Sequence, residues 1–129
     1  MKQNSSRIFL IAVIFILAAC ATSAFGQNAP SVGGYKSANV EDKDVKFAAD
    51  FAVKAKAKEL NQKLELQSIA KAERQVVQGT NYRLCMEVYA PPLKEGEDGV
   101  TVWATVIVWR APYGEMKLTK WEESDCNEQ

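Results

Sequence analysis

The sequence contains no histidine, and this absence excludes several common kinds of site. A Ser-His-Asp or Cys-His nucleophile cannot be assembled without an imidazole, and neither can a histidine-based metal site. Paired carboxylates need no histidine, and Glu87 with Glu122 is one pair that could act in this way. Acidic residues spaced like these are far more often solvated strand positions. We therefore predict that the chain is not an enzyme and needs neither a metal nor a cofactor.

An excess of basic residues is also missing. The 129 residues include 16 Lys and Arg and 16 Asp and Glu. Because Lys2 and Arg7 lie in a segment that we expect to be removed, the remaining chain has 14 basic and 16 acidic side chains, a net charge of −2. Binding to a nucleic acid or to an anionic membrane surface usually requires a basic patch. The charge balance predicts neither partner.

One apolar run, Ile8–Ala19, is too short to cross a bilayer comfortably. It follows the basic Lys2 and Arg7 and precedes small residues, which is the order of parts in a signal peptide. We predict that residues 1–26 are a signal peptide and that a secreted, extracellular domain covers residues 27–129.

Two positions near the end of this segment suit cleavage. Ala24 and Gly26 both have small residues at the sites that signal peptidase reads. A second possibility is Leu17-Ala18-Ala19-Cys20, which has the form of a bacterial lipobox. In that case Cys20 becomes the lipidated first residue of a membrane-anchored lipoprotein, with residues 21–30 as a tether. Ordinary secretion is our first interpretation, and both routes take the domain out of the cytosol.

A helix is the first periodic element of the predicted domain. Residues 27–35 have no periodicity and contain Pro and Gly, so we predict a flexible arm there. A helix is predicted from about Val40 to Lys58, with Asn39 or Asp42 as its cap. Small apolar residues recur at helical spacing on one face, Val45, Ala48, Ala49, Ala52 and Val53. Small side chains let a helix lie close to its neighbour, here a sheet.

Four strands joined as hairpins are predicted after the helix. Their ranges are Glu65–Val77, Thr80–Ala90, Val100–Arg110 and Met116–Glu122. Leu66 and Ile69 fall on opposite parities, which predicts a bulge near Gln67–Ser68. The third strand is apolar on both sides, so either of two sets faces inward: Val102, Val106 and Val108, or Trp103, Ile107 and Trp109. One helix followed by antiparallel hairpins predicts an α+β domain.

The turn between the first two of these strands carries two valines beside a glycine, in Gln75-Val76-Val77-Gln78-Gly79. Turn tips are usually built from Asn, Asp, Ser, Gly or Pro, because their backbone groups face water. An exposed branched aliphatic side chain is therefore a candidate contact residue. The alternative is that both valines complete the strand and pack into the core. Local sequence does not decide between these readings.

Taken in order, these features resemble the cystatin family of cysteine-protease inhibitors. Val32-Gly33-Gly34 is similar to the family's N-terminal glycine region, and the helix from Val40 is similar to the family's single helix. Gln75–Gly79 fits the family's QxVxG signature at every fixed position. Pro112-Tyr113 stands where the family usually has Pro-Trp. The ordered set at these spacings is more specific than QxVxG alone.

The resemblance implies a fold and a mechanism. The fold is cystatin-like α+β, with one long helix packed on a four- to five-stranded antiparallel sheet. The arm and two hairpin loops would insert as a wedge into the active-site cleft of a papain-like cysteine protease, of cathepsin or papain type. Inhibition would be reversible and noncovalent, and we expect a monomer. The implied protease-binding residues are Val32, Gly33, Gln75, Val76, Val77, Gln78, Gly79, Pro112 and Tyr113.

A non-inhibitory secreted binding module of the same fold is the alternative function, since a fold does not determine a function. Two features depart from the family pattern. Tyr113 replaces tryptophan and offers less contact area. Secreted animal cystatins carry two disulfides, whereas only Cys85 and Cys126 follow the predicted signal peptide. Counted through the hairpins, these two cysteines lie about two strands apart, so we predict that they are not bridged.

Overall fold

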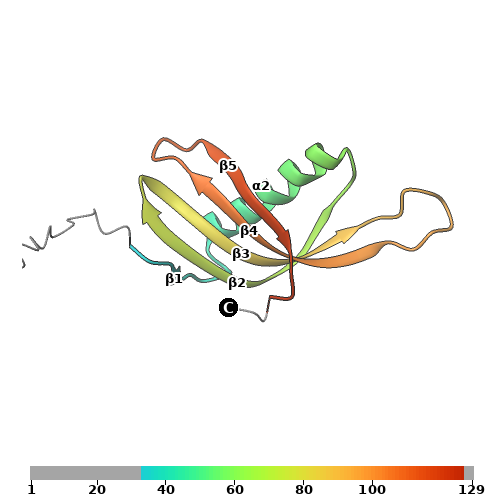
Figure 1. Cartoon of the computed structure of the whole chain (residues 1–129), viewed down its shortest axis with the longest axis horizontal. Coiled ribbons are helices and arrows are strands. Elements are labelled where there is room, and N and C mark those ends of the chain that lie inside the picture. Colours follow the sequence, from blue (N-terminus) through green and yellow to red (C-terminus); the bar gives the residue numbers. More distant parts are fainter. Residues whose placement is uncertain (1–32, 127–129) are drawn as a thin grey trace, which may run out of the picture. The chain divides into compact units, whose positions relative to one another are not determined.

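The structure, a computed structural model, describes residues 33–126 (Figure 1). The predicted signal peptide, its cleavage sites, the lipobox at Cys20 and the arm residue Val32 lie outside the described residues. The elements in chain order are β1 (Lys36–Ser37), α2 (Lys43–Leu60), β2 (Glu65–Val77), β3 (Gly79–Ala90), β4 (Val100–Arg110) and β5 (Met116–Glu123).

The helix α2 is capped at both ends by residues adjacent to it in sequence, Asp42 at the N-terminus and Asn61 at the C-terminus. The Asp42 carboxylate accepts a hydrogen bond from the Asp44 amide at 2.8 Å. Asn61 closes the other end in the left-handed conformation, with φ 50°. The predicted start at Val40 is three residues early, because Asn39 instead caps a preceding turn through the Glu41 amide.

The strands form one antiparallel sheet in the order β1-β2-β3-β4-β5. The four predicted strands are confirmed to within one residue at each end, and β1 is an additional short edge strand. The predicted bulge is confirmed between Leu66 and Ser68, and a second register shift lies between Ile69 and Lys71. These bulges bend β2 as it passes the helix.

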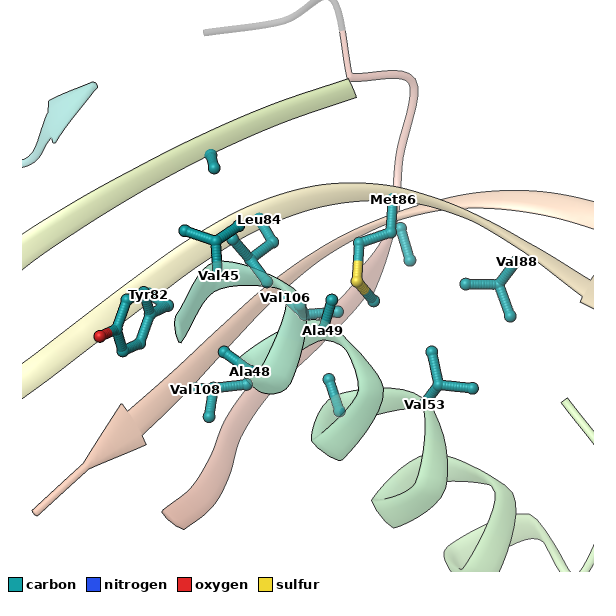
Figure 2. Packing of buried hydrophobic residues seen from close by; sticks show 13 residues of the cluster. Val45, Ala48, Ala49, Val53, Tyr82, Leu84, Met86, Val88, Val106 and Val108 are labelled. Atoms are coloured by element: carbon teal, nitrogen blue, oxygen red, sulfur yellow. The ribbon is translucent and has the colours of Figure 1, made fainter. Parts of the chain in front are cut away.

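The core lies between α2 and the inner face of the sheet. All five residues predicted for the buried helix face are buried, and the three alanines have no exposed surface. Figure 2 shows the helix residues Val45, Ala48, Ala49 and Val53 beside Leu84 and Met86 of β3 and Val106 and Val108 of β4. Of the two sets considered for β4, the one with Val106 and Val108 therefore faces the helix. Burial of each large aliphatic side chain here contributes about 1.5–3 kcal/mol.

A disulfide joins Cys85 of β3 to Cys126 of the C-terminal segment, with 5.8 Å between the Cα atoms. Our prediction that these cysteines are not bridged is therefore wrong. The prediction continued β5 in a straight line, whereas the chain leaves that direction after Ser124 and crosses β4 to reach Cys85 of β3. The Ser124 amide donates to the Trp103 carbonyl at 3.1 Å. The Ser124 and Thr105 hydroxyls share a hydrogen bond of 3.0 Å.

Within residues 33–126, no helix is long and apolar enough to cross a membrane. The same part of the chain holds no group of three or more acidic or cysteine side chains that is arranged to bind a metal ion.

Candidate functional site

The β2–β3 turn and the β4–β5 turn lie side by side at one end of the sheet, opposite the long β3–β4 loop (Figure 1). This follows from the register. Val77 pairs with Gly79 around the first turn, which leaves Gln78 at the tip. Thr80 in turn pairs with Arg110, the last residue of β4 before the second turn. The sheet therefore brings together two hairpin tips that are more than thirty residues apart in sequence.

The first hairpin presents one valine and partly buries the other. Val76 is 68% exposed, whereas Val77 is half-buried. The Gln75 side-chain oxygen Oε1 accepts a hydrogen bond of 3.2 Å from the side-chain nitrogen Nδ2 of Asn81, its partner in the ladder. The hairpin thus holds an exposed apolar side chain on a braced backbone. The alternative that both valines belong to the core is excluded for Val76.

Gly79 lies tightly against β4. Its φ is +92°, a conformation that residues with a side chain rarely adopt. A Cβ atom added there would lie 2.2 Å from the Arg110 carbonyl oxygen. Just before it, the Gln78 carbonyl accepts a hydrogen bond of 2.9 Å from the Trp109 indole. The glycine of the signature sequence is therefore required for the close approach of the first hairpin to β4.

The second hairpin presents an aromatic side chain at its tip. The Gly114 amide donates to the Ala111 carbonyl at 3.0 Å, and the Ala111 amide donates to the Glu115 carbonyl at 2.7 Å. These bonds close the turn, with Gly114 at φ +96°. Pro112 is exposed, and Tyr113 is fully exposed. An unburied tyrosine on a closed turn is available to a partner.

The arm reaches this same end of the molecule. The strand β1 runs antiparallel to β2, with Lys36 opposite Arg74. Toward the N-terminus from β1, the arm lies beside Val76. A Cβ atom added to Gly33 would lie 4.0 Å from the Val76 carbonyl oxygen. Of the two predicted arm residues, Gly33 is thus placed beside the first hairpin, and Val32 lies outside the described residues.

Comparison with known proteins identifies the family. A family model described as SQAPI, aspartic acid proteinase inhibitor, matches residues 37–123. L-cystatin from Tachypleus tridentatus is 36% identical over 106 residues, which cover 70% of this chain and 80% of that protein. The chain belongs to the cystatin family.

Two plant proteins are also similar to this cystatin. Cysteine proteinase inhibitor 5 from Arabidopsis thaliana is 32% identical over 120 residues, 92% of this chain and 90% of that protein. Cysteine proteinase inhibitor 1 from Actinidia chinensis var. chinensis is 32% identical over 90 residues, 68% of this chain and 71% of that protein. These relatives are named as inhibitors and not as enzymes.

Solved structures confirm the predicted α+β cystatin-like fold. A salivary cystatin from the soft tick Ornithodoros moubata matches with a TM-score of 0.59 and 18% identity, over 72% of this chain and 98% of that chain. Dimeric human cystatin F matches with a TM-score of 0.57 and 18% identity, over 81% of this chain and 98% of that chain.

Two ion pairs join neighbouring elements of this cystatin. The Arg110 guanidinium donates to the Asp44 carboxylate in the first turn of α2, at 2.8 Å, and this bond raises the pKa of Arg110. On the outer face of the sheet, Arg83 Nε donates to Glu73 Oε2 at 2.7 Å. That hydrogen bond lowers the pKa of Glu73, so the carboxylate stays ionised.

Three residues at the cystatin's hairpin end were not among the predicted site residues: Trp109, Arg110 and Tyr35. Their contacts join residues far apart in the chain, and short-range periodicity carries no sign of them. The one feature of the sequence that pointed to such contacts was that β4 has apolar residues on both of its faces. A tryptophan on the face away from the core needs another partner, and here the partner is the first hairpin.

Proposed function

We propose that this cystatin is a reversible, noncovalent inhibitor of papain-like cysteine proteases, and that its arm and two hairpins insert into the active-site cleft. The observation that carries the proposal is the exposure of Val76 and Tyr113 on two adjacent, braced turns. The names of the curated relatives support the same class of target. The proposed contact residues are Val32, Gly33, Gln75, Val76, Val77, Gln78, Gly79, Pro112 and Tyr113.

The proposed block is steric. The hairpin tips fill the cleft, and no covalent bond forms between the protease and the inhibitor. Burial of Val32, Val76, Val77 and Tyr113 supplies roughly 6–10 kcal/mol before the cost of association. Ordering of the arm and loss of rotational and translational freedom oppose binding, so micromolar to nanomolar affinity is expected. The hydrogen bonds from Asn81 to Gln75 and from Trp109 to Gln78 reduce this cost, because they hold the first hairpin in place before binding.

A second candidate function is inhibition of aspartic proteases, which the description of the matching family model favours. That match begins at residue 37, after the arm. An inhibitor of this class would not depend on Val32 or Gly33. A non-inhibitory binding module is the third possibility, and it would leave both classes of protease active.

Titration of proteases separates these candidates. Protein expressed from the full chain is added to papain, to a cathepsin and, at acidic pH, to pepsin. Inhibition of papain or the cathepsin supports the first proposal, and inhibition of pepsin alone supports the second. Unchanged activity of all three at tens of micromolar inhibitor would leave the binding module.

Paired variants test whether the hairpin tips make the contact. Val76→Asp is expected to weaken papain inhibition at least about tenfold, because an apolar contact is replaced by a buried charge. Tyr113→Ala is expected to have an effect of similar size. The matched controls are Val100→Asp and Leu93→Ala, at exposed apolar positions toward the opposite end of the sheet. Equal effects in variants and controls would contradict the proposed contact surface.

We also propose that the protein is exported and acts as a monomer. The Cys85–Cys126 disulfide supports export, because disulfides persist in oxidising compartments. Mass determination of the N-terminal peptide from the expressing organism distinguishes cleavage after Ala24 or Gly26 from lipidation of Cys20. An intact, unprocessed N-terminus would contradict export by either route.

A further inference from the structure

The edge strand that carries the arm is very short. Only Lys36 and Ser37 of β1 pair with β2, opposite Arg74 and Glu73. One further bond, from the Ala38 amide to the Ala72 carbonyl at 2.9 Å, continues the contact. Such a short ladder has little cooperative support from strand pairing alone. The residue that connects it to Gly33 and Gly34 is Tyr35.

Tyr35 has a partner two strands away. Its ring centroid lies 3.9 Å from the Arg83 guanidinium carbon, so the ring stacks on the guanidinium plane. Arg83 belongs to β3, and β2 lies between β1 and β3. The aromatic ring therefore crosses the outer face of β2 and ties the base of the arm to the centre of the sheet.

The guanidinium is itself fixed in place. Arg83 and Glu73 are direct partners in the β2–β3 ladder, and their side chains are joined by the 2.7 Å hydrogen bond. Their side chains are only 26% and 16% exposed. Lys71 Nζ lies 3.6 Å from the other Glu73 oxygen. Tyr35 consequently stacks on a cation with little freedom to move.

We propose that Tyr35 is a positioning residue that, by stacking on Arg83, holds the base of the N-terminal arm beside the first hairpin. This inference rests on the proposed function of the arm. Gly33 already lies next to the Val76 carbonyl in the unbound protein. A protease that binds both the arm and the hairpin then meets a partly ordered surface, and less conformational entropy is lost on binding.

A double-mutant cycle tests the proposal with protein expressed from the full chain. Tyr35→Leu is expected to raise the Kd for papain about two- to fivefold, the range that corresponds to an exposed cation–π contact. Tyr35→Phe keeps the stacked ring and is expected to restore wild-type affinity. Val32→Asp removes the favourable contribution of the arm. In that background Tyr35→Leu should have no further effect, since the arm no longer contributes.

A matched control separates positioning from a general loss of folding. Tyr89→Leu makes the same change on the same strand face as Arg83 but at the opposite end of β3, and papain binding should not change. An equal cost of Tyr35→Leu with and without Val32→Asp would overturn the proposal, because Tyr35 would then contact the protease directly.

A measurement without protease keeps this inference separate from the proposed function. Hydrogen exchange of the Ala38 amide reports how firmly β1 is held. Tyr35→Leu and Arg83→Lys are each expected to accelerate this exchange about two- to fivefold. Unchanged exchange would overturn the role of Tyr35 even in a protein that inhibits papain. Accelerated exchange in a protein that inhibits no protease would support the positioning and contradict only the proposed function.

Discussion

The Trp109 indole donates a hydrogen bond of 2.9 Å to the carbonyl oxygen of Gln78, so a residue of β4 holds the tip of the β2–β3 hairpin. Gly79, the residue after Gln78, packs against the carbonyl group of Arg110, which belongs to β4 like Trp109. Arg110 in turn pairs with Asp44 at the start of the helix. The candidate contact surface is therefore built on a chain of interactions that begins in α2 and ends at the first hairpin.

Replacement of Trp109 by phenylalanine removes the indole donor and keeps an aromatic ring. We expect a loss of about 0.5–1 kcal/mol in the free energy of unfolding, because the freed Gln78 carbonyl can bond to water. Papain inhibition should weaken as the tip loses its support. Urea unfolding and inhibition assays measure both. Trp103→Phe, on the same strand face but at the other end of β4, is the control; equal losses of inhibition would contradict a specific role for Trp109.

Gly79→Ala is expected to destabilise the protein by more than the roughly 1–3 kcal/mol cost of a left-handed backbone alone. The added methyl group would meet the Arg110 carbonyl at 2.2 Å, and the two strands must separate. Gly96→Ala is a close control, since Gly96 has φ +87° but no atom within 4 Å of an added Cβ. Thermal unfolding should show a larger loss for Gly79→Ala. Equal losses would mean that the close approach to β4 has no energetic weight.

Removal of the Cys85–Cys126 bridge by paired serine substitutions should lower the free energy of unfolding by about 3–4 kcal/mol, because the bridge closes a loop with a sequence separation of 41. Papain inhibition at a temperature where the variant remains folded should be retained, since the hairpin tips keep their own hydrogen bonds. Mass spectrometry under nonreducing conditions checks the bridge itself. Two free thiols in the native protein would contradict it.

Glu73→Gln tests the outer-face ion pair through its pH dependence. The hydrogen bond from Arg83 holds the pKa of Glu73 below its ordinary value of 4.5. The stabilisation is therefore complete above the unfolded-state pKa and is lost as the pH falls through the lower, folded-state pKa. At neutral pH, Glu73→Gln should cost about 1 kcal/mol.

The difference between wild type and Glu73→Gln in urea unfolding should shrink as the pH falls below 4.5. Glu122→Gln is the control, because Glu122 belongs to an exposed pair with Lys120 and contributes at most about 1 kcal/mol. A Glu73→Gln cost that does not change with pH would show that the effect is one of packing and not of charge.

Local pattern predicted the helix and four of the five strands of this cystatin, but not the short edge strand β1. The helical spacing of Val45, Ala48, Ala49, Ala52 and Val53 predicted the buried face without error, because periodicity directly reflects which side of a helix meets the core. The strand bounds and the bulge near Gln67–Ser68 followed from alternation in the same way. The sequence also predicted turns at Gln75–Gly79 and at Pro112–Gly114, and the resemblance to the cystatin family implied that the two turns act together.

Only the tertiary structure decided which of these residues is available and what supports it. The exposure of Val76 beside a half-buried Val77 depends on how the hairpin tip leaves the sheet. The Trp109–Gln78 and Tyr35–Arg83 contacts depend on the register of three neighbouring strands. The Cys85–Cys126 bridge depends on the path of the chain after β5. These two contacts and the disulfide join segments that are distant in sequence, and no local periodicity encodes where such segments meet in space.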